Sequence, residues 1–195
     1  MSEEVFKSVK TGNAVLEKRS IEIPKGVEVK LLGKNHIQVK HKKTTLERKF
    51  ERVPTQIVVK EDHVEVFDYF VKRKSRALVG TITAHIVNMI KGVQNPYMYK
   101  LKIIYSHFPI TVKVVGKEVE YTGLYGQRDR KRIPIIGADT KVKVAGEDIE
   151  VSGPDLEAVS QTAASIEQST RLRGKRAKDI RIFQDGIYTY ERNKN

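Results

Sequence analysis

The stretch Val27-Glu-Val-Lys-Leu-Leu-Gly33-Lys34 reappears later in the chain as Ile110-Thr-Val-Lys-Val-Val-Gly116-Lys117. Apolar and polar residues alternate in both stretches, which is typical of a strand with one buried face, and each Gly-Lys pair predicts a turn. A second match, His63-Val-Glu-Val66 with Asp148-Ile-Glu-Val151, precedes a helical pattern in both places. Because the same elements follow in the same order, the sequence predicts an internal duplication. Chance similarity between strand-turn-strand segments is the alternative.

Helical patterns complete both halves of the predicted repeat. Steps of three and four between apolar residues predict a helix through Val79, Ile82, Ile86, Met89 or Ile90, and Val93. Gly92 and Pro96 predict the end of this helix. A second stripe predicts a helix through Leu156, Val159, Ala163 and Ile166, with Ser152 as its N-cap.

The patterns together predict an α+β fold made of two tandem copies of a small unit, each an antiparallel sheet packed against an α-helix. We expect the first unit over residues 20–95 and the second over residues 96–190. Residues 1–19 are predicted to form an N-terminal extension, partly helical around Ala14–Lys18, and residues 191–195 a short tail.

The composition indicates a polyanionic partner. The chain has 37 Lys and Arg against 24 Asp and Glu, a formal charge of +13. Such an excess repels itself in a folded protein, and nucleic acid is its commonest reason, because each phosphate neutralised releases counterions. An anionic membrane surface is the weaker alternative, since no apolar run is long enough to span a bilayer. The absence of cysteine excludes disulfides and thiolate sites. With no signal-peptide pattern at the N-terminus, we expect a cytoplasmic protein.

The positive residues gather in three clusters, which we interpret as RNA-binding because Arg suits both phosphate and base stacking. The first precedes the first helix: Arg73, Lys74 and Arg76. The second is a Gly-flanked loop: Arg128, Arg130, Lys131 and Arg132. The third follows the second helix: Arg171, Arg173, Lys175, Arg176, Lys178 and Arg181. Solvated surface loops are the alternative interpretation.

A fourth, more dilute cluster lies on the first predicted sheet. Its members are Lys40, Lys42, Lys43, Arg48 and Lys49, and acidic residues Glu47 and Glu51 interrupt it. Local ion pairing and RNA contact are therefore equally compatible with the sequence here.

No pattern in the sequence indicates catalysis, a cofactor or a metal site. No two of the five histidines have the helical spacing of a zinc site, and cysteine is not available to complete one. No Gly-rich loop has the spacing of a P-loop. We interpret His85 as a packed or RNA-facing helix residue and His107 as a structural hydrogen-bonding residue between the two units. We therefore expect no enzyme activity, no cofactor and no small-molecule substrate.

Four motifs resemble those of one family. They are Gly80-Thr-Ile-Thr-Ala-His85-Ile-Val-Asn88-Met-Ile-Lys-Gly92, Tyr105-Ser-His107-Phe-Pro109, Gln161-Thr-Ala-Ala-Ser-Ile-Glu-Gln168 and Arg181-Ile-Phe-Gln-Asp185-Gly186-Ile-Tyr188. In this order they are similar to the first helix, the joining segment, the second helix and the C-terminal signature of the large-subunit ribosomal protein L-six family (L-nine in eukaryotic naming), in its eukaryotic and archaeal type. The resemblance covers roughly residues 20–190.

The resemblance implies a structural component of the large ribosomal subunit with a duplicated α+β fold. It implies a place near the translation-factor-binding region, in a cytosolic ribosome. The expected partners are large-subunit rRNA and neighbouring ribosomal proteins, and the main rRNA contacts are expected in the second unit, from the cluster that follows its helix. Two rival hypotheses are a non-ribosomal RNA-binding adaptor with a similar scaffold and an RNA-processing enzyme with an unrecognised Asp/His site.

Overall fold

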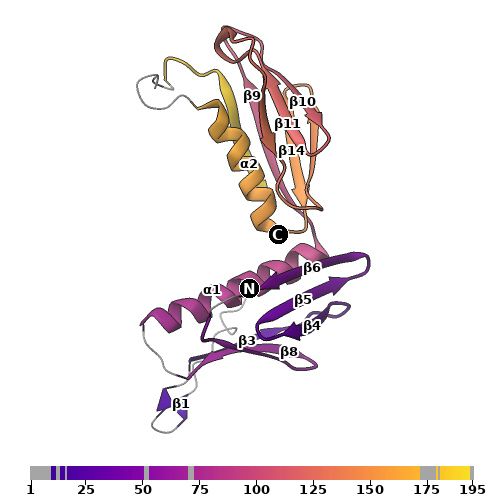
Figure 1. The fold of residues 1–195 in the computed structure, drawn as a ribbon, viewed down its shortest axis with the longest axis vertical. Helices are drawn as coiled ribbons and strands as arrows, with labels where there is room; N and C mark the ends of the chain where they lie inside the picture. The colour runs from indigo at the N-terminus through magenta and orange to yellow at the C-terminus, as the bar shows by residue number, and fades with distance from the viewer. Residues whose placement is uncertain are drawn as a thin grey trace. The chain divides into compact units, whose positions relative to one another are not determined.

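The computed structural model describes residues 10–11, 14–15, 17–50, 53–69, 73–171, 179 and 181–193. The chain divides into two compact units, residues 1–94 and residues 95–195. Figure 1 shows the same kind of unit twice, a helix lying against antiparallel strands. Each unit is described by itself below.

The first unit has two three-stranded antiparallel sheets and one long helix. Its strands are β1 (Lys10–Thr11), β2 (Ala14–Val15), β3 (Glu17–Glu22), β4 (Glu28–Gly33), β5 (His36–His41), β6 (Thr44–Lys49), β7 (Gln56–Val59) and β8 (His63–Asp68), and its helix is α1 (Arg73–Gln94). The sheet orders are β3-β8-β7 and β4-β5-β6, and β1 pairs with β2 alone. Helix α1 contacts strands of both sheets.

The second unit has a four-stranded and a three-stranded antiparallel sheet. Its elements are β9 (Tyr97–Ile104), β10 (Thr111–Val115), β11 (Glu118–Thr122), the short 3-10 helix η2 (Leu124–Gly126), β12 (Lys131–Pro134), β13 (Lys141–Ala145), β14 (Asp148–Gly153), α2 (Leu156–Thr170) and β15 (Gly186–Asn193). The sheet orders are β13-β14-β9-β15 and β10-β11-β12. Helix α2 contacts β9, β14 and β15 of the first sheet and β12 of the second.

The two units share one topology. In both, the first strand of the main sheet pairs with the last strand before the helix, β3 with β8 and β9 with β14. In both, the next three strands form a separate meander, β4-β5-β6 and β10-β11-β12. The predicted α+β class with two tandem copies of a sheet-and-helix unit is confirmed. Among the described elements, β15 and η2 of the second unit have no counterpart in the first, and β1 and β2 of the first have none in the second.

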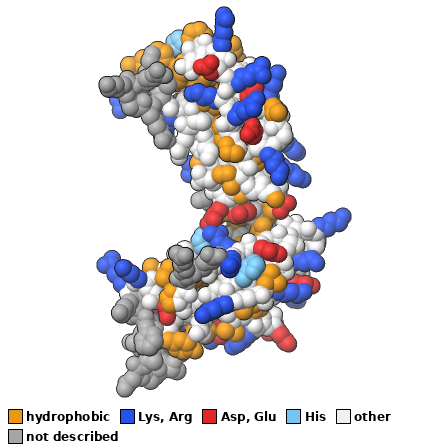
Figure 2. Space-filling view, viewed as in Figure 1, with side chains coloured by type: hydrophobic (Ala, Val, Ile, Leu, Met, Phe, Trp, Pro, Cys, Tyr) orange, Lys and Arg blue, Asp and Glu red, His pale blue; other side chains and the backbone are white. Residues whose placement is uncertain are grey.

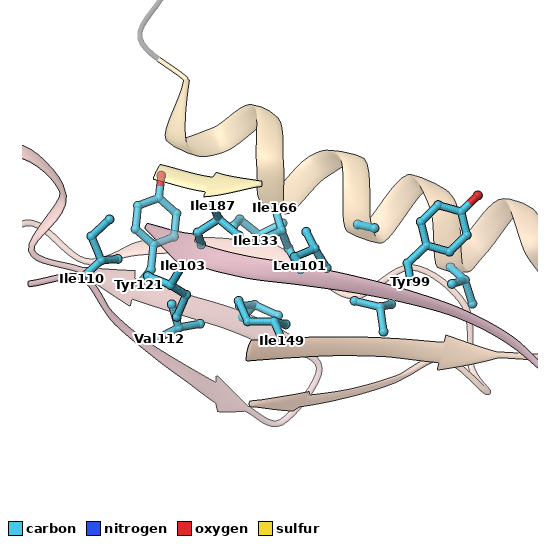
Figure 3. Close-up of a cluster of buried hydrophobic side chains, with 14 of the residues drawn as sticks. Tyr99, Leu101, Ile103, Ile110, Val112, Tyr121, Ile133, Ile149, Ile166 and Ile187 are labelled. Atoms are coloured by element: carbon cyan, nitrogen blue, oxygen red, sulfur yellow. The ribbon is translucent and has the colours of Figure 1, made fainter. Parts of the chain in front are cut away.

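Each unit has its own apolar core. In the first, the predicted stripe on α1 is buried, with Val79 and Ile86 fully enclosed against Val64 and Val66 of β8. In the second, alternate residues of β9 face α2, so that Leu101 and Ile166 meet between strand and helix (Figure 3). Burial of such side chains stabilises the fold by roughly 1.5–3 kcal/mol each. The period-two pattern of β9 and the period-3.6 pattern of α1 therefore mark the buried faces of these two elements.

Several predicted element ends differ in the structure. Helix α2 begins one turn later than predicted, and its N-cap is Asp155, whose carboxylate accepts the backbone N–H of Glu157 at 3.0 Å, while Ser152 lies in β14. Gly92 lies inside α1, which continues to Gln94. The helical tendency predicted around Ala14–Lys18 is wrong, because β2 and the start of β3 occupy these residues. Strand β15 continues into the residues predicted as a tail.

Glu65 of β8 is an ionised side chain that contacts three basic side chains. Its Oε1 lies 2.8 Å from Nζ of Lys18, 2.7 Å from Nζ of Lys60 and 3.0 Å from Nε2 of His63. The hydrogen bond from Lys18, followed by the one from Lys60, lowers the pKa of Glu65 from 4.5 to about 2. Glu65 therefore links β3 and β8 as an anion.

We expect Glu65→Gln to reduce the acid resistance of the first unit. A carboxyl group whose pKa falls on folding stabilises the folded state above its unfolded pKa, and this contribution is lost as the pH falls from about 5 towards 2. Because Lys60 is half exposed and solvent screens the pair, we expect the substitution to cost about 1–2 kcal/mol at pH 7 and little at pH 2.5. Urea unfolding followed by circular dichroism at both pH values measures this. Glu61→Gln, at an exposed position next to β8, is the control.

Candidate nucleic-acid interface

Two connections of the second unit meet at one end of its sheets. The β9–β10 connection contains Phe108 and Pro109, and the β11–β12 connection begins with Gly123. Gly123 has φ +91°, and a Cβ atom there would lie 2.2 Å from the carbonyl oxygen of Pro109. At Gly126, which has φ +73°, an added Cβ atom would lie 3.2 Å from the Phe108 ring. Glycine is required at residue 123 because only a residue without Cβ permits this approach.

Asp185 fastens the C-terminal segment to the β9–β10 connection. Its side chain is fully buried, and Oδ1 accepts the backbone N–H of Ser106 at 2.7 Å and lies 3.5 Å from Nδ1 of His107. Burial acts to raise the pKa of Asp185, but the hydrogen bonds from Ser106 and His107 outweigh it, so that the pKa is lowered. Asp185 is therefore an anion at neutral pH. His107, predicted to lie between the units, has this structural role inside the second unit.

Four aromatic side chains gather around this junction, and we call them the aromatic cluster: His107, Phe108, Tyr125 and Phe183. The rings of His107 and Phe183 are stacked, with centroids 5.2 Å apart, and Tyr125 lies 6.5 Å from Phe183. The Tyr125 hydroxyl donates to the Asp185 carbonyl at 3.2 Å. About half of the His107 side chain and of Phe108 is exposed. Exposed rings held in place suit stacking on unpaired RNA bases.

The predicted basic loop follows the aromatic cluster directly. Arg128 and Arg130 lie exposed in the connection, and Lys131 and Arg132 begin β12. Nε of Arg130 lies 3.7 Å from a carboxylate oxygen of Glu120, and Nε of Arg132 lies 3.3 Å from its other oxygen. Within the described residues, Arg128 and Lys131 have no ion pair within 4 Å. The connection thus presents cations that an external anion can bind.

The third predicted cluster is described only at its two ends. Arg171 is the exposed C-cap residue of α2, close enough to Tyr188 for its charge to oppose the rise that burial causes in the pKa of Tyr188. Arg181 is exposed, and its backbone N–H donates to Asp179 at 2.9 Å. The cluster members Arg173, Lys175, Arg176 and Lys178 lie outside the described residues. Arg181 lies two residues before Phe183 in the sequence.

The first predicted cluster lies at the start of α1, in the first unit. Arg73 and Lys74 are exposed, and neither has an ion pair within 4 Å in the part of the chain that is described. Nε of Arg76 lies 3.3 Å from a carboxylate oxygen of the buried Glu17, which ties α1 to β3. Arg76 therefore has a structural role that the sequence did not indicate.

The aromatic cluster is the feature that sequence reasoning missed. Two resemblance motifs, 105–109 and 181–188, contain three of its four members, but nothing in the sequence showed that these segments touch. The one signal in the sequence was the recurrence of aromatic residues in these connections, two of which also contain Gly and Arg. Among the described residues there is no group of His, Cys, Asp and Glu suited to a metal ion. No described helix is long and apolar enough to cross a membrane.

Figure 2 shows Lys and Arg side chains along the edge of the second unit formed by β10 and β11. A doubled α+β scaffold that presents cations and exposed rings from its connections is an arrangement typical of nucleic-acid-binding proteins.

Comparisons with known proteins specify the class. The family model described as Ribosomal protein L6 matches residues 23–95. The "Large ribosomal subunit protein uL6" of Staphylothermus marinus is 47% identical over 174 residues, which cover 88% of this chain and 92% of that protein. The proteins of the same name from Methanosphaera stadtmanae and Saccharolobus solfataricus are 43% and 44% identical, and cover 88% and 91% of the chain and 91% and 96% of their own lengths. The chain therefore belongs to the ribosomal protein L6 family, which makes it a structural ribosomal protein and not an enzyme.

Proposed function

We propose that this protein positions large-subunit rRNA, and that the end of the second unit with the aromatic cluster and the Arg128–Arg132 loop is its principal RNA-binding surface. The observation that supports this most is that the loop beside the exposed rings carries Arg128 and Lys131, which have no ion pair within 4 Å among the described residues. Cations neutralise phosphates, and rings stack on bases exposed in loops and bulges. Neither kind of contact requires a conformational change of the protein. The surface is therefore suited to holding folded RNA in one position.

The proposal also covers the rRNA segment that is bound and the neighbouring proteins. The rRNA segment is expected in the 3′ region of the large rRNA, near the translation-factor-binding side of a cytosolic ribosome, as the family resemblance implies. Neighbouring large-subunit proteins are the other expected partners. The names of the relatives, each a large ribosomal subunit protein, support this assembly over a free adaptor. A high-salt sucrose gradient of a lysate of the source cells tests it, since an adaptor would remain at the top while a subunit protein sediments with the large subunit.

We expect the double variant Arg128→Gln with Arg130→Gln to bind rRNA about tenfold more weakly at 100 mM salt, because up to two phosphate contacts are lost. Filter binding to a transcript of the 3′ region of S. marinus large-subunit rRNA measures this. Arg128 and Arg130 are exposed, so thermal stability should stay nearly constant.

Two control variants make this result specific. Lys141→Gln with Lys143→Gln removes the same charge from exposed positions on β13 and should change affinity much less. Arg128→Lys with Arg130→Lys keeps the charge but removes the planar fork, and an intermediate loss is expected. Equal losses in the β13 variant and the loop variant would mean that only net charge matters, and would contradict the proposed surface.

A further inference from the structure

The first unit has a pair of connections equivalent to those of the candidate interface. The β3–β4 connection contains the turn Pro24-Lys25-Gly26, and the β5–β6 turn contains Lys42 and Lys43. His41 joins the two turns, because its Nδ1 lies 2.8 Å from the carbonyl oxygen of Gly26. The equivalent connections of the second unit meet at Gly123 and Pro109. Both repeats therefore bring their first and third connections together.

Four lysines of the first unit lie within two residues of Gly26 or His41, and we call them the lysine corner: Lys25, Lys40, Lys42 and Lys43. All four are exposed, and within the described residues none has an ion pair within 4 Å. Figure 2 shows Lys and Arg side chains projecting from the first unit where β5 turns into β6. Lys42 has φ +53°, in the left-handed region, so the turn is sharp. The corner is a fixed group of like charges with no described acid to neutralise it.

The neighbouring acidic residues are engaged elsewhere. Glu47 is the local partner that the sequence offers. Its carboxylate accepts a hydrogen bond from Nε2 of Gln38 at 2.6 Å and lies 3.8 Å from Nε2 of His36. Glu28 is opposite Lys40 in the register of β4 and β5, but its carboxylate lies 3.5 Å from Nζ of Lys30. Among the described residues, Lys40, Lys42 and Lys43 therefore have no ion pair within 4 Å, and Glu47 is not their partner. Glu51 lies outside the described residues.

We propose that the lysine corner is a second RNA-binding surface, which takes the phosphate backbone of an RNA segment other than the one held by the second unit. The inference rests on the proposed function and extends it to the first unit. Clustered like charges repel each other, and phosphates relieve that repulsion while releasing counterions. The duplication gives the surface its position, since the same two connections present cations in both repeats.

The chemistry of the two surfaces differs, and so do their expected roles. The second unit combines arginines with exposed aromatic rings. In the two turns of the lysine corner the only aromatic ring is that of His41, which is hydrogen-bonded to Gly26. Lys is a compact, strongly hydrated point charge without a fork for bases. The corner should therefore add affinity and salt dependence without selecting nucleotides. Two surfaces on one chain make the second contact intramolecular once the first has formed.

The experiment compares two quadruple variants of the full chain. One replaces Lys25, Lys40, Lys42 and Lys43 by Gln, and the control replaces Lys91, Lys102, Lys141 and Lys143, which are exposed on α1 and on strands of the second unit. Filter binding to a full-length transcript of S. marinus large-subunit rRNA is measured from 50 to 300 mM salt. We expect the slope of log affinity against log salt to become shallower by about 2–4 in the corner variant and by less than about 1 in the control. Equal changes in both variants would overturn the proposal.

A second measurement locates the RNA directly. The chain has no cysteine, so Lys43→Cys and Arg128→Cys each create a unique site for an iron chelate that cleaves nearby RNA. We expect Lys43→Cys to cleave the same transcript at nucleotides different from those cleaved from Arg128→Cys. Cleavage from residue 128 alone would overturn the lysine corner and leave the proposed function intact. Cleavage from neither site, with no binding by the unmodified chain, would remove both.

Discussion

Raising monovalent salt from 50 to 200 mM should weaken binding of this protein to large-subunit rRNA by about three to five decades. This follows if six to ten phosphates are neutralised, because each releases counterions whose return is favoured at high salt. The charge of +13 and the described cations without intramolecular partners, such as Arg128 and Lys131, provide for contacts on that scale. Filter binding at five salt concentrations measures the slope.

If the protein unfolded at high salt, its affinity for RNA would also fall, but electrostatics predicts no such loss of stability. Screening reduces the repulsion among the surplus positive charges, so the folded state should be as stable at 200 mM salt as at 50 mM. Circular dichroism spectra of the free protein at the two concentrations provide the control. If affinity stays constant across the range while the protein remains folded, phosphate neutralisation does not drive binding and the electrostatic proposal is wrong.

Local periodicity was enough to predict the fold class. Alternation placed strands at Val27–Leu32 and Ile110–Val115, and steps of three and four placed the buried face of α1. These patterns indicate the type of element without knowledge of its partner. On α1 the pattern also marks the buried face, whereas in β4 and β10 Leu31 and Val114 of the alternating series are exposed. Duplication was visible because both repeats keep the same order of patterns.

Element ends and β15 were not predictable in the same way. Ser152 and Asp155 are both good N-cap residues, and the choice between them depends on β14, which pairs with β9 through Gly153. Strand β15 has the composition of a tail, with Tyr190, Glu191 and Arg192 in sequence, and becomes a strand only because β9 offers a free edge. Tertiary pairing decides such elements, and one sequence does not display it.

The sequence predicted the basic loops of the candidate site but not its aromatic cluster. The charged loops were visible because Arg and Lys cluster along the chain. The aromatic cluster was not visible, because its segments lie far apart in the sequence. They meet where the buried Asp185 carboxylate of the C-terminal segment contacts His107. The roles of Arg130 and Arg132 were also hidden, since Glu120 becomes their neighbour only when β11 pairs with β12.

Replacing Gly123 by Ala should destabilise the second unit by about 3–5 kcal/mol. Gly123 has φ +91°, and the added Cβ would lie 2.2 Å from the carbonyl oxygen of Pro109, a backbone atom. Gly123 also donates its N–H to Gln127 at 3.2 Å and accepts the N–H of Gly126 at 3.0 Å. The clash can be relieved only by moving a connection and losing these bonds, each worth about 1 kcal/mol, in addition to the left-handed penalty of about 1–2 kcal/mol.

Gly116→Ala is the matched control, because it separates the clash from the backbone penalty. Gly116 has φ +61° in the β10–β11 turn, and no atom lies within 4 Å of the added Cβ. We expect a cost of about 1–2 kcal/mol there. Urea unfolding followed by circular dichroism measures both variants, with separate transitions allowed for the two units. Equal costs would mean that the contact between the two connections contributes nothing.

The same pair of variants connects stability with binding. A displaced β11–β12 connection moves Tyr125 off Phe183 and Arg128 away from the aromatic cluster, whereas a strained β10–β11 turn leaves both in place. Gly123→Ala should therefore weaken rRNA binding by about tenfold or more at a temperature where the variant is still folded, and Gly116→Ala should not. If Gly123→Ala loses stability but keeps full affinity, the rings and arginines act independently of their placement, and rigid presentation of the surface is not the basis of binding.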